Sequence, residues 1–334
     1  MANSLIRLDE SASVSKYRQI VNSILNAIRE GELKVGDQMP SINNVCNEWN
    51  LSRDTVLAAY NELKAKGVLS SAPGKGYYIE SVNIDLTHKV FVLFDELNSF
   101  KEDLYTSFID TLGDNAQVEL YFHHFNRKQF DMLLKENNSK YTTYVIMPAK
   151  FEGIAASLRN LSGRVVVLDQ LPADLGDEFP AIYQNFEKDV YRALSSGREL
   201  LKKYSKLIMV YPGGKEPEGQ YKGFLKFCSE AGIAYELISD VRDRNIVAGE
   251  AYIAIADRDL IHVVKKCKEA CLPLGESVGL ISYNDTSLKE IVANGITTIS
   301  TDFKEMGATL ANLVLSKKSV QVENPSALII RGSL

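Results

Sequence analysis

Mostly polar side chains follow the short apolar runs in the longer, second part of this chain, at the point where each run ends. If the runs are parallel strands, these side chains meet at one edge of a sheet, where open α/β sheets bind ligands. Carboxylates and amides can hydrogen-bond several hydroxyl groups, so the set suits a polyhydroxylated, uncharged ligand and suits a phosphate poorly. Each residue alone also fits a strand-end turn, so the prediction depends on their shared location. The residues are Asp95 after VFVLF, Pro148 after YVIM, Asp169 and Gln170 after VVVL, Tyr211 after LIMV, Asp257 after YIAIA, and Asn284 after VGLISY.

A second set of candidates lies near the amino terminus, where a helical pattern begins at Ser52. The amino-terminal end of a helix offers free backbone N–H groups to a phosphate, and Arg53 in that position can reach a guanine in the major groove. Further along, glycines flank Lys75, and they let a hairpin backbone approach a duplex closely. The predicted DNA contacts are Ser41, Ser52, Arg53, Asp54, Thr55, Gly74, Lys75 and Gly76.

The familiar motifs of catalysis are missing from the sequence. There is no phosphate loop ending in Lys-Ser/Thr and no G-x-S-x-G nucleophile elbow, and no G-x-G-x-x-G follows the first apolar run of the second part. YPGGKEPEG has the wrong spacing for a nucleotide loop, and Pro217 interrupts the helix start. The four cysteines and four histidines show no metal-ligand spacing. We therefore expect no catalytic residue, no metal and no cofactor.

The elements that would position the DNA candidates can be read from the first eighty residues. Apolar residues at helical spacing predict a helix over 15–30, a second helix from Ser41 through Glu48, and a third that begins at Ser52 and ends at Gly67. VLSSAPGKGYYI then predicts a β-hairpin. Three helices and a hairpin make a winged helix-turn-helix. Its nine basic residues balance nine acidic ones, so attraction to DNA must come from their placement.

The rest of the chain alternates apolar runs with amphipathic stretches, which predicts repeated βαβ units in parallel sheets covered on both faces. Its length suits two doubly wound lobes. The predicted organisation is a winged helix-turn-helix domain over 1–80, a linker over 81–87 and a two-lobed α/β domain over 88–334. The amphipathic stretches are 103–112, 151–161, 189–203, 220–231 and 259–270.

Composition bounds the protein class. The chain has 334 residues, 45% of them hydrophobic, and a net charge of −5, which argues against non-specific coating of nucleic acid. No apolar run approaches the roughly 18–20 residues of a membrane span. The amino terminus lacks the basic-then-apolar layout of a signal peptide, so we expect a cytoplasmic protein.

The first domain resembles the DNA-binding domain of the GntR family of bacterial transcription regulators. The matching residues are KYRQIVNSILNAIREGELKVGDQMPSINNVCNEWNLSRDTVLAAYNELKAKGVL and the later GKGYYI. The resemblance implies operator contacts by Arg53 and Thr55 and by the glycine-rich wing. Three positions depart from the family pattern: Asn43 and Leu57 stand where arginine is usual, and Asp54 where threonine is common.

The second domain resembles the periplasmic-binding-protein-like effector domain of the LacI/GalR repressors. The stretches that carry the resemblance include VVVLDQLP, EGQYKGFLKFCSEAGI, VGLISYND and ALIIRGSL. The resemblance implies sugar contacts at Asp169, Asp257 and Asn284, and at Gln220 where an arginine is common. Losing that arginine removes a fork suited to carboxylates, so a neutral sugar, a pentose or deoxyhexose, is expected.

Together the two resemblances imply a DNA-binding regulator whose operator affinity is controlled by a small ligand and which acts as a homodimer. Hinges are expected near 183–186, 300–302 and 317–320. One alternative is a regulator whose second domain binds a non-sugar metabolite or serves mainly for dimerisation. The sequence also leaves open an aminotransferase-type body, a pure sugar-binding protein and a nucleotide-dependent enzyme.

Overall fold

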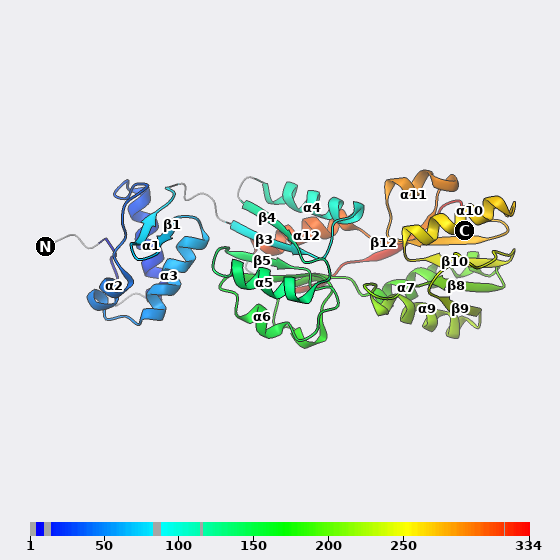
Figure 1. The fold of residues 1–334 in the computed structure, drawn as a ribbon, viewed down its shortest axis with the longest axis horizontal. Helices are drawn as coiled ribbons and strands as arrows, with labels where there is room; N and C mark the ends of the chain where they lie inside the picture. Colours follow the sequence, from blue (N-terminus) through cyan, green and yellow to red (C-terminus); the bar gives the residue numbers. More distant parts are fainter. Residues whose placement is uncertain (1–4, 10–14, 83–87, 114–115, 317) are drawn as a thin grey trace.

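A computed structural model describes residues 5–9, 15–82, 88–113, 116–316 and 318–334. Figure 1 shows three bodies in a row: an amino-terminal head, a first α/β lobe and a second α/β lobe that holds the carboxyl terminus. Five of the seven residues of the predicted linker, 83–87, lie outside the described residues. The linker over 81–87 therefore stays a prediction.

The head is the winged helix-turn-helix that the sequence predicts. Ser15, Ser41 and Ser52 each cap a helix by accepting a hydrogen bond from a backbone N–H three residues on, which satisfies a donor that the helix leaves free. Buried apolar residues from all three helices share one core with the hairpin. The elements are α1 (Lys16–Arg29), α2 (Ile42–Trp49), α3 (Arg53–Ala65), β1 (Leu69–Ala72) and β2 (Gly76–Ile79).

The first lobe is built on a six-stranded sheet in the order β13-β7-β6-β5-β3-β4, with every neighbouring pair parallel. Helices α4 and α12 pack together over one face, where α12 returns from the end of the chain. The strands are β3 (His88–Phe94), β4 (Ala116–Phe122), β5 (Thr143–Ile146), β6 (Arg164–Asp169), β7 (Ala181–Tyr183) and β13 (Gln321–Glu323). The helices are α4 (Ser99–Leu112), α5 (Arg127–Asn137), α6 (Ala155–Arg159), the short 3₁₀ turn η2 (Ala173–Leu175) and α12 (Phe303–Leu315).

The second lobe repeats this plan in the order β14-β12-β11-β10-β8-β9, with only the β14 edge antiparallel. Helices α7 and α9 pack closely against each other in this lobe. The strands are β8 (Lys206–Val210), β9 (Ala234–Ile238), β10 (Glu250–Ala254), β11 (Gly279–Tyr283), β12 (Thr297–Thr301) and β14 (Ser326–Ile329). The helices are α7 (Phe186–Ser196), α8 (Arg198–Leu201), α9 (Glu218–Ala231), α10 (Asp257–Glu269), α11 (Ser287–Ile291) and the 3₁₀ turn η3 (Val292–Asn294).

The chain passes between the lobes at three places. Two lie where hinges are expected from the sequence: between β7 and α7, and between β12 and α12. The third expectation, 317–320, is wrong. β13 still belongs to the first lobe, so the crossing falls at Asn324 and Pro325, just before β14 joins the second.

Further differences from the sequence predictions have local causes. The predicted helix over 151–161 shrinks to α6, because Ala149 and Gly153 adopt positive φ and form a loop first. The predicted helix over 189–203 divides at Gly197 into α7 and α8, and a Cβ there would lie 2.6 Å from Leu328. The sequence patterns predict neither β4 nor α5.

Candidate DNA-reading face and inter-lobe site

The amino-terminal end of α3 is exposed and carries the predicted DNA contacts. Ser52 caps the helix through the backbone N–H of Thr55, and the hydroxyls of the two residues lie 2.8 Å apart. Arg53 is exposed, and its Nη1 donates to Asn43 Oδ1 at 3.1 Å. Asn43 stands where the resembled family has an arginine, and it orients Arg53 from the neighbouring helix. Ser41 caps α2 through Asn44 at 3.1 Å, so its hydroxyl also lies at a helix start.

The hairpin ends in a tight tip with one cation. Gly74 and Gly76 have φ of +73° and +112°, a conformation that favours glycine, so the tip follows the predicted turn chemistry. Lys75 is exposed between them, and its carbonyl accepts a hydrogen bond from Gln38 Nε2 at 2.8 Å. The wing is thereby anchored to the loop before α2, and the ammonium stays outward.

Glu62, late in α3, joins the helices of the head. It accepts hydrogen bonds from the Tyr17 hydroxyl, from Arg18 at 3.0 Å and from Lys66 at 2.8 Å. Burial raises the pKa of Glu62, but the hydrogen bonds from Lys66 and Tyr17 outweigh it and hold the pKa below its usual range. The carboxylate therefore fixes α1 against α3.

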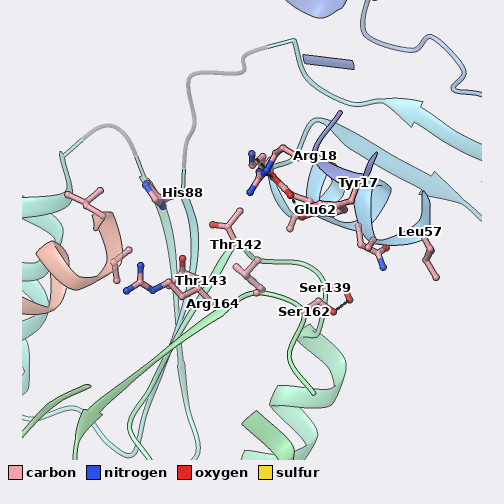
Figure 2. A pocket seen from close by; sticks show the side chains of 18 of the residues that line it. Tyr17, Arg18, Leu57, Glu62, His88, Ser139, Thr142, Thr143, Ser162 and Arg164 are labelled. Atoms are coloured by element: carbon pink, nitrogen blue, oxygen red, sulfur yellow. Dashed lines mark hydrogen bonds and ion pairs between the residues drawn. The ribbon is translucent and has the colours of Figure 1, made fainter. Parts of the chain in front are cut away.

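A groove of about 930 Å³ separates the head from the first lobe (Figure 2). Arg18 and Glu62 line it from the head, and His88, Thr142 and Arg164 line it from the lobe. Asp54 also lines this groove, whereas Arg53 does not. Of these two predicted DNA contacts, Asp54 therefore faces the first lobe and Arg53 does not.

The carboxyl ends of the first lobe's strands bring Asp95 and Asp169 together, as their positions predict. Asp95 is buried and paired with Lys101 Nζ, which comes from the first turn of α4. Asp169 is buried with a φ of +73° and accepts a 2.6 Å hydrogen bond from Gln184 Nε2. Burial raises the pKa of Asp169; Lys101 opposes this rise and Asp95 adds to it, so the three groups act on one another.

The second lobe contributes Gln220 on α9 and Tyr283 at the end of β11. Gln220 is 2% exposed, and its side chain lies beside Tyr283. Burial raises the pKa of Tyr283, and the carboxylates of Asp189, Asp169 and Glu216 raise it further. Because Asp169 belongs to the first lobe, this coupling spans the gap between the lobes.

A loop of the second lobe, residues 211–217, reaches across to the first; we call it the crossing loop. Lys150 Nζ of the first lobe donates to the carbonyl oxygens of Gly214 at 3.0 Å and Glu216 at 3.1 Å. Lys215 pairs with Glu96 of the first lobe, and its Nζ lies 5.1 Å from the centre of the Phe125 ring. Burial raises the pKa of the Glu216 carboxyl; Lys215 opposes this rise and Glu96 adds to it, with smaller effects from Lys101 and Asp95. We call Asp95, Lys101, Asp169, Gln184, Glu216, Gln220 and Tyr283 the inter-lobe site.

Two predicted ligand residues lie at its margin. Asp257 has a side chain that is 68% exposed and is ion-paired with Lys289 at 2.8 Å. Lys289 Nζ also donates to the carbonyl oxygens of Tyr283 and Asn284, so it connects Asp257 to the end of β11. Asn284 has a φ of +59°, and its buried Oδ1 has no hydrogen-bond partner among the described residues.

The remaining strand-end candidates have structural partners. The Tyr211 hydroxyl donates to the carbonyl of Glu216 at 2.8 Å and so shapes the crossing loop. Pro148 accepts a backbone hydrogen bond from Phe151, which turns the chain after β5. Gln170 lines a groove of about 320 Å³ that it shares with Gln184 at the junction of the lobes.

Sequence reasoning missed Lys101, Gln184, Glu216 and Tyr283. Lys101 lies just before the amphipathic stretch predicted over 103–112, and a charged side chain gives no reason to expect burial. Gln184 follows a three-residue strand that no apolar run marks. Glu216 belongs to YPGGKEPEG, whose spacing does not fit a nucleotide loop, but this stretch directly follows the end of β8, where ligand residues are expected.

Two further findings concern other kinds of site. Among the described ranges, no group of three or more histidine, cysteine or acidic side chains has an arrangement that could hold a metal ion. His123 is buried with Nε2 3.0 Å from the carbonyl of Met147, and burial lowers its pKa.

In the part of the chain that the structure describes, no helix combines the length and apolar character of a membrane span.

Comparison with known families agrees with both domains. Residues 16–79 match the bacterial regulatory proteins of the gntR family, and residues 201–334 match the periplasmic binding protein-like domain. The first match covers the head, and the second covers the second lobe and the returning chain. The aminotransferase-type body is thereby set aside.

Among curated relatives, the chain is 37% identical over 97 residues to the mannosyl-D-glycerate transport/metabolism system repressor MngR of Escherichia coli K12. That alignment covers 28% of this chain and 37% of the repressor, so the chain spans little more than a third of that relative's length. It is 27% identical over 115 residues to the transcriptional repressor YtrA of Bacillus subtilis, covering 34% of this chain and 85% of YtrA.

Among solved structures, a LacI family transcriptional regulator from Enterococcus faecalis V583 with bound ribose has the same fold. The TM-score is 0.62 at 21% identity, covering 73% of this chain and 98% of the other. The two-lobed body therefore has the architecture of LacI family effector domains.

The chain thus joins a GntR-type helix-turn-helix domain to a LacI-like, periplasmic-binding-protein-like domain. This is the organisation of a DNA-binding transcriptional regulator, and these relatives and fold neighbours are transcriptional regulators.

Proposed function

We propose that this chain is a one-component transcription regulator whose affinity for operator DNA is set by a small polyhydroxylated ligand, a monosaccharide, bound between the two lobes. The observation that carries the proposal is the inter-lobe site itself. Asp169 and Gln184 of the first lobe lie at the junction with Gln220 and Tyr283 of the second, and Lys150 and Lys215 join the lobes beside them. The ribose in the Enterococcus faecalis neighbour supports a sugar as the class of ligand.

The head supplies the DNA-reading half. The amino terminus of α3, with Arg53 and Thr55, would enter the major groove, and the wing with Lys75 would lie on the backbone beside it. Two heads are needed for a palindromic operator, so we propose a homodimer formed through the α/β bodies. Asp54 lines the groove toward the first lobe, so we propose that the head turns away from that lobe when it engages a duplex.

The ligand would act by favouring one closure state of the lobes. Closure would move the first lobe, which leads directly into the linker, and so change the separation of the two heads. A ligand shifts this equilibrium only by its difference in affinity for the two states, about 1–3 kcal/mol in typical allosteric proteins. Replacing residues 81–87 with a longer Gly/Ser segment should uncouple ligand from DNA.

A thermal-shift screen of the full chain against neutral, amino, acidic and phosphorylated monosaccharides tests the proposal. A ligand far above its Kd should stabilise the protein by a few kcal/mol. The matched variant is Asp169→Ala, which removes a carboxylate from the site and should lose the shift while still binding DNA. If the hit still stabilises Asp169→Ala fully, the ligand binds elsewhere and the assignment of the site is wrong.

A further inference from the structure

The inter-lobe site contains more carboxylates than cations. Asp95 and Lys101 neutralise each other as a buried pair. Asp169 and Glu216 bring two more carboxyl groups, and neither forms an ion pair within the ranges that the structure describes. The cations at the rim are engaged: Lys215 with Glu96, and Lys150 with backbone carbonyls. The interior therefore has an excess of negative charge when its acids are ionised.

Two residues of the site, and Asn284 at its margin, have a buried side-chain oxygen without a hydrogen-bond partner among the described residues. Gln184 is 8% exposed, and its Nε2 donates a hydrogen bond to Asp169. The Oε1 of Gln184 has no partner among the described residues. Gln220 is 2% exposed, and its Oε1 likewise has no partner there; nor does the buried Oδ1 of Asn284, which follows Tyr283 in the chain. All three are hydrogen-bond acceptors, and a buried acceptor without a donor is costly. The site therefore calls for a ligand rich in N–H and O–H donors.

From these two observations we infer that the effector is a polyhydroxylated molecule carrying a protonated amine, as in an amino sugar. The inference rests on the proposed function and narrows its ligand class, replacing the neutral sugar that the sequence favours. An ammonium group offers three donors and a positive charge, which suit the carboxylates of Asp169 and Glu216. The hydroxyl groups would donate to the amide oxygens. A phosphorylated or carboxylated sugar would place another negative charge beside these carboxylates, for which Lys101 is the cation of the site, and would be repelled.

Glu216 is the residue through which the site would select this charge. It arrives on the crossing loop, and Lys150 and Tyr211 hold its backbone carbonyl at 3.1 and 2.8 Å. The loop that carries its carboxyl contacts the first lobe through Lys150 and through the pair of Lys215 with Glu96. A ligand that pairs with Glu216 would favour closure, so charge recognition and lobe movement would be one event.

Isothermal titration of the full chain at pH 7.5 tests the inference with matched probes. The probes are glucosamine, galactosamine and mannosamine, each beside its parent hexose, its N-acetyl derivative and the hexose 6-phosphate. We expect at least one free amine to bind ten times or more tighter than its parent and its N-acetyl derivative, and no phosphate to bind. Glu216→Gln keeps the shape and removes the charge, and it should reduce that preference to less than threefold. Glu276→Gln, an exposed control before β11, should leave the preference unchanged.

Three results would overturn the inference: a parent hexose that binds as tightly as its amine, a phosphate that binds, or no binding by any of the three amines. Retention of the full preference in Glu216→Gln would remove this residue from the account. The proposed function fails differently. If a neutral hexose binds and shifts operator affinity, the proposed function stands and only the amine inference fails. If the chain binds no operator DNA, the proposed function is refuted, whichever sugar binds.

Discussion

Lys150 of the first lobe holds the carbonyl oxygen of Glu216 of the second lobe at 3.1 Å, and the neighbouring carbonyl of Gly214 at 3.0 Å. The covalent links between the lobes are the three crossings of the chain, and none of them passes through the crossing loop. Together with the pair of Lys215 and Glu96, the Lys150 ammonium group therefore ties this loop to the opposite lobe.

Lys150→Ala should open the lobes in the absence of ligand. The substitution removes two charge-assisted hydrogen bonds between the lobes. Small-angle X-ray scattering of the variant should give a larger radius of gyration, and its affinity for the effector should fall several-fold. Lys128→Ala removes an exposed lysine of α5 in the same lobe and should change neither quantity. Identical scattering for wild type and Lys150→Ala would mean that the crossing loop does not hold the lobes.

Arg53→Ala should weaken operator binding by about 1–3 kcal/mol and relax specificity, because a bidentate contact with a guanine would be lost. Fluorescence anisotropy with operator and scrambled duplexes measures both effects. The control Arg7→Ala removes a head cation paired with Glu32. Equal losses on the two duplexes would show that Arg53 contacts the backbone and reads no base.

Lys75→Ala should act in another way, since a cation on the wing would contact phosphate. Affinity should fall about equally for every duplex, and the slope of log K against log salt should become shallower by about one. A change of sequence preference without a change of salt slope would contradict the assignment.

Asp189→Asn should change how stability depends on pH. Burial raises the pKa of Asp189 from 3.8 to about 7, with Glu323 adding to the rise and Lys188 opposing it. The folded state thus retains a proton that the unfolded chain gives up, so this group lowers the free energy of unfolding as pH rises from 3.8 to about 7. The free energy of unfolding of the asparagine variant should therefore exceed that of wild type by about 1–3 kcal/mol at pH 8, and the difference should disappear in acid. Urea unfolding at several pH values measures this, with exposed Asp243→Asn as control; parallel curves for wild type and Asp189→Asn would refute it.

Much of this molecule can be predicted from local sequence. The head follows from three serine caps and helical periodicity, and the strands that contribute Asp95 and Asp169 are apolar runs with no competing pattern. The missed parts depend on contacts distant in sequence. Lys101 is buried because Asp95 pairs with it, and β13 belongs to the first lobe because it pairs with β7. Neither fact leaves a mark in the residues nearby.

The central claim is that a molecule bound between the lobes changes how the head binds DNA. The direct measurement is the operator Kd by fluorescence anisotropy, with and without the sugar that stabilises the protein, for wild type and for Asp169→Ala. We predict a shift of about 5–150-fold in wild type and none in the variant, which should bind free operator normally. No shift in wild type at saturating sugar, or an equal shift in both proteins, would contradict the account.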